Sequence, residues 1–312
     1  MNSSEPCFFK ESGMSPVLGI ILLLEFALGL IGNGVVLYIL CFCIPSWNIS
    51  TLYLFNVSFA DFLLIACLPF RADYFLHGKN WNFGDIPCRF MLFTLSLSRT
   101  GSIFFLTAVV VNRYYMIVHP HFRINMIKTI PGGLVVTITL WAVIILLSCY
   151  LLFTSHLVTE EIANKTLCES FNLNWDKSLI ISWHYVFFVI QLIIPLIIIL
   201  VCTGYIVRQL QRCKDNFGKI KRTIKSMTFV AFVFIFCFLP STVSTIIVVI
   251  SKYLTLCWLF DTSSLVFAAS LSLTYFNSVL NPLAIYISSL RFQKSLNNAC
   301  NCAEKRRLYE NR

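Results

Sequence analysis

The chain has 312 residues, of which 58% are hydrophobic and only 12% are charged, and its mean hydropathy is +0.79. A water-soluble domain needs far more polar surface than this composition supplies, so a soluble fold is excluded. The net charge of +10 does not call for a nucleic-acid partner, because the basic residues gather where anionic lipid headgroups and a cytoplasmic protein would lie.

Seven long segments that are nearly free of charge predict seven membrane-spanning helices. A bilayer core requires roughly 20 apolar residues per helix, and the segments are about that long or longer. The first three contain Glu25, Asp61 and Arg99 respectively, and the other four contain no Asp, Glu, Lys or Arg. In chain order they are residues 17–43, 52–70, 90–111, 130–154, 179–207, 226–251 and 262–290. We therefore predict an all-α membrane protein whose single domain, residues 17–290, is a seven-helix bundle.

Pro69, Pro195, Pro240 and Pro282 fall inside these segments, so kinked helices are expected. Residues 1–16 show no charged region followed by a small-residue cleavage site, so we expect the first helix to direct targeting.

A short amphipathic stretch, residues 290–300, follows the last segment. Phe292 and Leu296 share one face, and Arg291 and Lys294 the other, which predicts an eighth helix on the inner membrane surface within a cytoplasmic tail of residues 291–312. The two cysteines after it are either palmitoylated or plain thiols: Cys300 and Cys302.

The distribution of basic residues predicts the orientation. They concentrate at 113–128, at 208–225 and after 290, which places these connections in the cytoplasm. The other side holds most of the acids and two glycosylation sequons, at Asn2 and Asn164. We expect a plasma-membrane protein with an extracellular N-terminus.

Six of the 13 cysteines lie in the apolar segments, where Cys behaves as a small hydrophobe. Cys88 precedes the third segment and Cys168 lies in the second outer loop, so both are in oxidising space and are predicted to bond. Cys7 and Cys257 are the remaining outer cysteines. They either form a second disulfide or stay free thiols.

Seven helices alone leave several protein classes open. A retinal protein needs a lysine in its last helix, and residues 262–290 contain none. The zinc-protease pattern H-E-x-x-H is absent, and no repeated halves typical of transporters are obvious. With no nucleophile–base pair in the sequence, an enzyme is not expected.

One set of motifs, in order along the chain, resembles the rhodopsin-like (class A) G-protein-coupled receptors. A single motif would be weak, but the ordered set is specific. It comprises Gly32-Asn33, Asp61, Asn112-Arg113-Tyr114, Trp141, Pro195, Phe236-Cys237-Phe238-Leu239-Pro240 and Asn281-Pro282. The resemblance implies a receptor whose partner is a heterotrimeric G protein.

Within that family the chain is most similar to the hydroxycarboxylic acid receptors and the related oxoeicosanoid receptor. The segments that carry this likeness are residues 62–65, 68–74, 81–89, 98–103 and 273–278. It implies a carboxylate ligand, either a short hydroxycarboxylic acid or an oxo or hydroxy fatty acid, and signalling through Gi/o to lower cAMP. The alternatives are a nucleotide or lipid-phosphate receptor that uses Arg99 with Arg71 and Arg89, and an anion transporter with Arg99 at its midpoint.

Arg99 is the predicted ligand anchor. A charge in the middle of an apolar helix costs about 2.5–3.5 kcal/mol on insertion scales, so it is retained mainly for a purpose. Arg99 precedes Arg113 by close to four helical turns, so both side chains project from similar faces. A guanidinium suits bidentate binding of a carboxylate. The alternative is an internal ion pair with Asp61 or Glu25. The resemblance also implies pocket residues Tyr275, Ser170, Phe171, Trp81 and Phe267.

An aspartate such as Asp61 carries a high free-energy cost in a membrane helix unless it is neutral or paired. The resemblance surrounds it with Ser102, Asn277 and Asn281, whose oxygens suit a sodium ion, although a hydrated cluster is an alternative. No other cofactor is expected.

In the resembled receptors, helix six swings outward on activation and frees the arginine that corresponds to Arg113 for the G protein. Tyr114, Phe238, Pro240, Asn281 and Pro282 belong to the same switch. Asn112 replaces the usual acid beside Arg113, Phe238 stands where Trp is common, and Ile285 replaces a Tyr. These departures predict an altered balance between inactive and active states.

Overall fold

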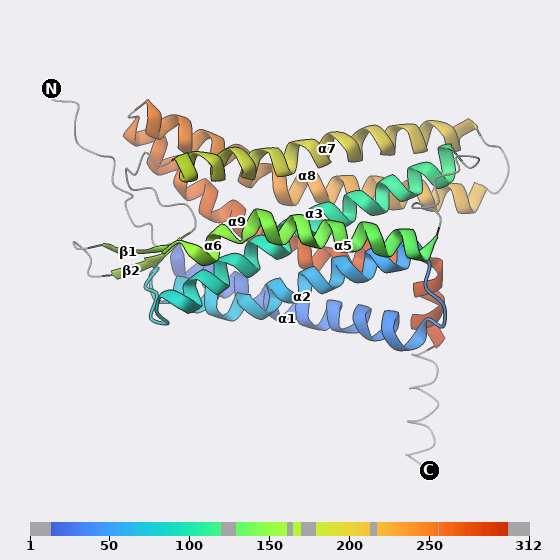
Figure 1. The fold of residues 1–312 in the computed structure, drawn as a ribbon, viewed down its shortest axis with the longest axis horizontal. Coiled ribbons are helices and arrows are strands. Elements are labelled where there is room, and N and C mark those ends of the chain that lie inside the picture. Colours follow the sequence, from blue (N-terminus) through green and yellow to red (C-terminus); the bar gives the residue numbers. More distant parts are fainter. Residues whose placement is uncertain are drawn as a thin grey trace, which may run out of the picture.

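The structure is a computed structural model that describes residues 14–119, 129–160, 165–169, 179–212, 217–254 and 256–298. In this part of the chain, long helices run side by side as one elongated bundle (Figure 1). They are α1 (Ser15–Tyr38), extended by the π-helical turn η1 (Ile39–Cys43), α2 (Ile49–Leu76), α3 (Asp85–Val118), α5 (Ile130–Ser148), extended by α6 (Tyr150–Phe153), α7 (Leu179–Arg212), α8 (Phe217–Tyr253) and α9 (Cys257–Ser288). The predicted seven-helix bundle is confirmed.

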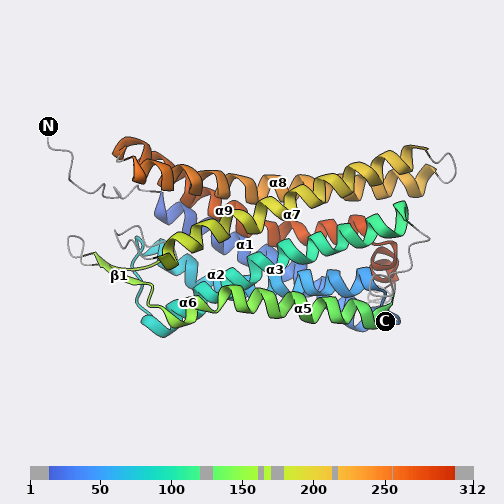
Figure 2. The ribbon, with the colours of Figure 1, turned by 45° about the horizontal axis from the view of Figure 1, so that its top comes forward.

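Neighbour contacts arrange the helices as a ring in the order α1, α2, α3, α7, α8, α9, with α9 returning to α1. Helix α5 packs outside the ring, against α2 and α3, and lies along one edge in Figure 2. Side chains that point inward from α2, α3 and α9 therefore meet in the middle of the ring.

Six helices of the described residues are long and apolar enough to cross a membrane. Helix α9 completes the bundle with 32 residues. Its polar side chains are buried within the bundle: Ser270, Thr274, Asn277, Ser278 and Asn281.

Small residues allow the helices to approach closely. A Cβ added at Gly101 of α3 would lie 3.1 Å from the Cβ of Ala60 in α2. One added at Gly32 of α1 would lie 3.0 Å from the Pro282 ring in α9. These glycines allow α2 to pack closely against α3, and α1 against α9, which brings the functional side chains together.

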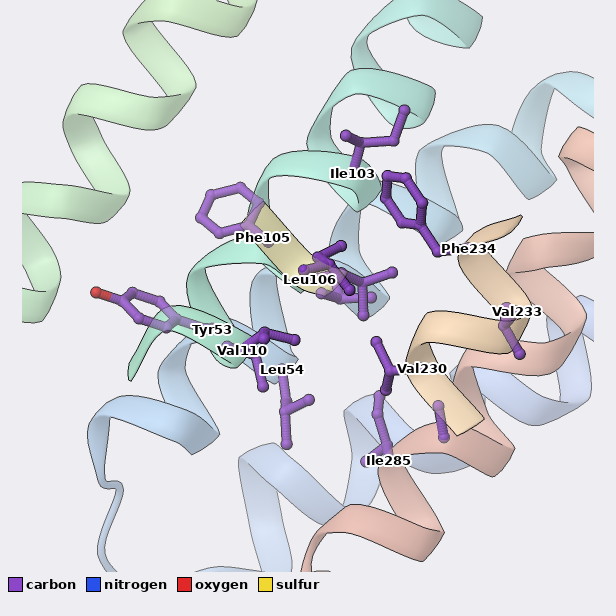
Figure 3. Close-up of a cluster of buried hydrophobic side chains, with 14 of the residues drawn as sticks. Tyr53, Leu54, Ile103, Phe105, Leu106, Val110, Val230, Val233, Phe234 and Ile285 are labelled. Carbon is purple, nitrogen blue, oxygen red and sulfur yellow. The ribbon is translucent and has the colours of Figure 1, made fainter. Parts of the chain in front are cut away.

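A hydrophobic core fills the half of the bundle away from the start of α1. Figure 3 shows Ile103 and Leu106 of α3 directed toward Phe234 and Val230 of α8. Ile285 of α9 closes the same cluster. The core therefore joins α3, α8 and α9, the three helices that carry the candidate switch.

A small hairpin that the sequence pattern did not predict lies at the end of the bundle where α1 begins (Figure 1). Strands β1 (Leu157–Glu160) and β2 (Lys165–Cys168) are antiparallel, with Leu157 opposite Cys168. The predicted disulfide is confirmed: Cys88 at the start of α3 is bonded to Cys168, with their Cα atoms 5.9 Å apart. We call this the hairpin end, and the other the opposite end.

A short helix over residues 290–298 follows α9 and turns across the opposite end (Figures 1 and 2). Phe292 is buried in the core and Leu296 packs against it, while Arg291 and Lys294 are exposed, as predicted. The Ser295 hydroxyl donates to the Cys43 carbonyl at 3.4 Å, which fastens this helix to η1. Cys300 and Cys302 lie outside the described residues.

Candidate functional site

Arg99 projects from α3 into the ring near the hairpin end. Its guanidinium carbon lies 3.5 Å from the centroid of the Phe188 ring on α7, a cation–π contact. Its Nε and Nη2 atoms are buried and have no hydrogen-bond partner among the described residues. No salt bridge of the described part joins it to Asp61 or Glu25. The buried Arg99 guanidinium therefore has an aromatic neighbour in the described structure, and not Asp61 or Glu25.

Tyr275 of α9 is 7% exposed and lies within electrostatic range of both Arg99 and Arg71. Arg71, in α2, is also buried, and its Nη1 donates to the Cys168 carbonyl at 3.1 Å. Two guanidinium groups and one phenol, from three helices, therefore converge beneath the hairpin. An oxyanion placed here would find several strong donors.

The neighbours of Arg71 and Arg99 could not all be found from sequence. From sequence, Arg71 is connected only with the alternative of a phosphate ligand. Its position two residues after Pro69 in an apolar helix is a signal that it lies at the ligand site. Its guanidinium also lies 5.0 Å from the ring centroids of Tyr74 and of Phe75. Phe188 gave no sequence signal, because the chain has 29 phenylalanines and most serve only to pack.

Glu169, the residue after the disulfide, holds the hairpin over this region. Its Oε1 accepts a hydrogen bond from the Tyr74 hydroxyl at 3.1 Å, and Lys79 Nζ lies 3.6 Å from the same oxygen. The carbonyl of Cys168 and the side chain of Glu169 thus both engage α2 or the turn after it. These contacts fix the position of β2 relative to Arg71.

Among the other predicted pocket residues, Trp81 is buried, and its indole N–H donates to the Gly84 carbonyl at 2.8 Å. Its backbone N–H donates to the Thr166 carbonyl at 2.7 Å, so Trp81 supports the hairpin. Phe267 is a partly buried residue of α9. The remaining predictions lie outside the described residues: Ser170, Phe171, Asn2, Asn164 and Cys7; Cys257 begins α9, but its side chain is not described.

Asp61 of α2 is 1% exposed and lies at the centre of a polar cluster. Ser102 Oγ donates to its Oδ1 and Asn281 Nδ2 donates to its Oδ2, both at 2.7 Å. The Oδ1 atoms of Asn277 and Asn281 are buried acceptors without a donor among the described residues. One carboxylate with surplus amide oxygens fits a hard monovalent cation such as sodium.

At the opposite end, Arg113 and Arg222 both reach the last turn of α9. Arg113 Nη2 donates to the Ser288 carbonyl at 3.0 Å, and Arg222 Nε donates to the Ile287 carbonyl at 3.3 Å. Asn112 Nδ2 donates to Ser50 Oγ of α2 at 3.1 Å. The terminal carbonyls of a helix lack intrahelical donors and carry partial negative charge, so they suit guanidinium groups.

All of these residues except Ile287 line a cavity of about 290 Å³. Its described lining contains Arg113, Arg222 and Arg291 but no acidic residue. Tyr114 is not in the lining, and its hydroxyl contacts His119 Nε2 at 3.1 Å. The cavity is therefore a basic opening between α2, α3, α8 and α9.

Comparison with known proteins gives one consistent result. The model of the 7 transmembrane receptor (rhodopsin family) matches residues 32–286. Hydroxycarboxylic acid receptor 2 of Rattus norvegicus is 40% identical over 99% of this chain and 86% of its own length. Hydroxycarboxylic acid receptor 1 of Homo sapiens is 40% identical over 98% and 86%, and oxoeicosanoid receptor 1 of Homo sapiens is 34% identical over 93% and 74%. The chain therefore belongs to the rhodopsin family of seven-transmembrane receptors.

Proposed function

We propose that this receptor lies in the plasma membrane with its hairpin end and N-terminus outside the cell, binds a carboxylate beside Arg99, and signals through Gi/o to lower cAMP. The basic cavity and the basic connections then face the cytoplasm, as the positive-inside rule favours. The ligand is a short hydroxycarboxylic acid or an oxo or hydroxy fatty acid.

The single observation that carries the proposal is the buried guanidinium of Arg99 with two nitrogens that lack a partner among the described residues. A desolvated cation without an acid is costly, and an entering carboxylate relieves that cost with charge-assisted hydrogen bonds. Relatives whose names denote hydroxycarboxylic and oxoeicosanoid acids support the same ligand class.

Arg71 and Tyr275 provide a second and a third donor. Arg71 keeps a buried Nε without a partner in the described part, although its Nη1 is held by Cys168. We propose that the ligand carboxylate lies between these side chains, and that an acyl chain extends toward Phe267. The hairpin then covers the ligand from outside.

A screen of hydroxy acids and oxidised fatty acids on transfected cells tests the proposal. Inhibition of cAMP and activation of individually supplied Gα classes would be measured for wild type, Arg99→Ala and Arg89→Ala. Arg89 is the matched control, because it is an outer cation of α3 that already pairs with Asp85. We expect Arg99→Ala alone to lose the response.

Three outcomes would count against the proposal. Equal responses of wild type and Arg99→Ala would remove Arg99 as the anchor. Responses to nucleotides or lipid phosphates but not to carboxylates would favour the phosphate receptor. Uptake of radiolabelled acid into vesicles would favour a transporter.

A further inference from the structure

A cluster of buried hydroxyl groups lies between α8 and α9, level with Tyr275. Each member is at most 3% exposed, and its members are Ser241, Ser244, Thr245, Ser270 and Thr274. Two contacts cross the interface: Ser244 Oγ lies 3.1 Å from Ser270 Oγ, and Thr274 Oγ1 lies 3.0 Å from Ser241 Oγ. We call this set the hydroxyl cluster.

The cluster surrounds the point at which Pro240 interrupts α8. Proline has no N–H to donate to the carbonyl four residues earlier, and its ring crowds that carbonyl, so hydrogen bonding is perturbed here. The next carbonyls take hydroxyl donors: the Phe238 carbonyl is 2.9 Å from Ser241 Oγ and 3.2 Å from Thr242 Oγ1. The Cys237 carbonyl is reached from the other helix, by Thr274 Oγ1 at 3.1 Å.

Thr274 can make this bond in more than one direction. Its Oγ1 lies 3.1 Å from the Cys237 carbonyl and 3.2 Å from the Ser270 carbonyl of its own helix. A hydroxyl carries one hydrogen, which it can donate to one of these acceptors at a time. When the hydrogen is donated to the Cys237 carbonyl or to Ser241 Oγ it ties α9 to α8, and when it is donated to the Ser270 carbonyl it bonds within α9.

We propose that Thr274 is a positioning residue that couples the ligand anchor Tyr275 to the kink of α8 at Pro240. Thr274 and Tyr275 are consecutive, so a shift of the Tyr275 backbone toward a bound carboxylate moves the Thr274 hydroxyl relative to the Cys237 carbonyl. Bonded to α8, Thr274 restrains the outward swing of that helix, and bonded within α9 it permits the swing. The role of Tyr275 rests on the proposed function, whereas the restraint on α8 does not.

Two substitutions at Thr274 test the role of its hydroxyl. Thr274→Val keeps the branched shape and removes the donor, while Thr274→Ser keeps the donor. Thr107→Val is the matched control, because among the described residues the Thr107 hydroxyl bonds only to the Ile103 carbonyl of its own helix, at 2.7 Å. Ligand-independent Gi/o activation per surface receptor would be measured for each variant, together with binding of and response to radiolabelled lactate and 12-hydroxyeicosatetraenoic acid.

We expect Thr274→Val to raise ligand-independent activation on the order of three- to tenfold, the shift that one net hydrogen bond can produce. Its ligand-induced increment should shrink while probe affinity changes by less than about threefold. Thr274→Ser and Thr107→Val should resemble wild type.

Ligand-independent activation equal to wild type in Thr274→Val would overturn the proposal. Equal changes in Thr274→Val and Thr274→Ser would also overturn it, because the effect would then not depend on the presence of the hydroxyl. If neither probe activates wild type, neither acid is the ligand of the proposed function, yet the ligand-independent comparison still decides the role of Thr274.

Discussion

Arg99 and Arg113 lie on the same helix, and neither is balanced by a carboxylate in the described part of the chain. Arg99 rests on the Phe188 ring, and Arg113 donates to a helix-terminal carbonyl. Both arrangements provide weaker compensation than a carboxylate would, so both cations keep donors for an incoming anion or partner. Under the proposed function, the same residue type serves the ligand near the middle of α3 and the G protein near its end.

Asp61→Asn tests the proposed sodium site. The substitution keeps the size of the side chain but removes the negative charge and one of the acceptors used by Ser102 and Asn281. We expect wild-type receptor in detergent to gain thermal stability in NaCl relative to KCl at equal ionic strength. Asp61→Asn should lose that gain and be destabilised by about 1–3 kcal/mol through the disturbed buried hydrogen bonds. An unchanged sodium effect in the variant would exclude Asp61 as a ligand.

Helix α9 is held at the opposite end by two arginines from other helices. Arg222 of α8 and Arg113 of α3 bond to consecutive carbonyls of its last turn. Helix α8 contains no Asp or Glu between Phe217 and Tyr253, so an ion pair from Arg113 to α8 cannot form there. Among the described residues, the hydrogen bonds from Arg113 and Arg222 to carbonyls of α9 replace that ion pair.

Arg222→Gln should therefore raise ligand-independent signalling, because the charge-assisted bond from α8 to α9 is lost. Such bonds contribute about 1.5–3 kcal/mol when buried, and a discount for partial exposure leaves an expected rise of about threefold to tenfold. Lys221→Gln is the matched control, since Lys221 is the exposed neighbour of Arg222 on the same helix. A rise of the same size in both variants would point to general loss of basic charge instead.

The hairpin end carries a buried histidine that makes this element sensitive to pH. Burial and the nearby Arg89 lower the pKa of His156 below its ordinary value of 6.5, against the opposing effect of Asp85. The neutral ring is favoured in the fold, so the stabilisation is complete above pH 6.5 and is lost as the pH falls through the lowered pKa.

After correction for the intrinsic exchange rate at each pH, hydrogen exchange of the β1–β2 amides should therefore accelerate as the pH falls below 6.5. His156→Gln, which cannot charge, should remove most of that dependence while keeping a partner for Thr154 Oγ1, which lies 2.9 Å from the imidazole Nε2. The same acceleration in His156→Gln would assign the pH effect to another group.

The helices could be predicted from charge-free segments, because lipid demands long apolar stretches. The hairpin could not, since its four-residue strands are held by Cys88, Trp81 and Glu169 and not by a pattern of their own. At the site, Arg99 and Asp61 stood out as charges in apolar segments. Phe188, Arg222 and the hydroxyl cluster did not, because their roles depend on which helices become neighbours.

In the whole molecule, the ring of six helices joins three sites along one axis. The cluster of Arg71, Arg99 and Tyr275 lies beneath the hairpin, Asp61 lies deeper, and the basic cavity opens at the opposite end. Helices α2, α3 and α9 contribute to all three, so we expect a change at one site to affect the others. The proposed function depends on a negatively charged ligand beside Arg99.

The most direct test compares a radiolabelled carboxylic acid agonist with its uncharged primary amide, each bound to wild type and to Arg99→Gln. Wild type should prefer the acid by on the order of a hundredfold or more, because the amide leaves the buried guanidinium without a charged partner. Arg99→Gln should bind acid and amide about equally. A preference for the acid that persists unchanged in Arg99→Gln would contradict the account.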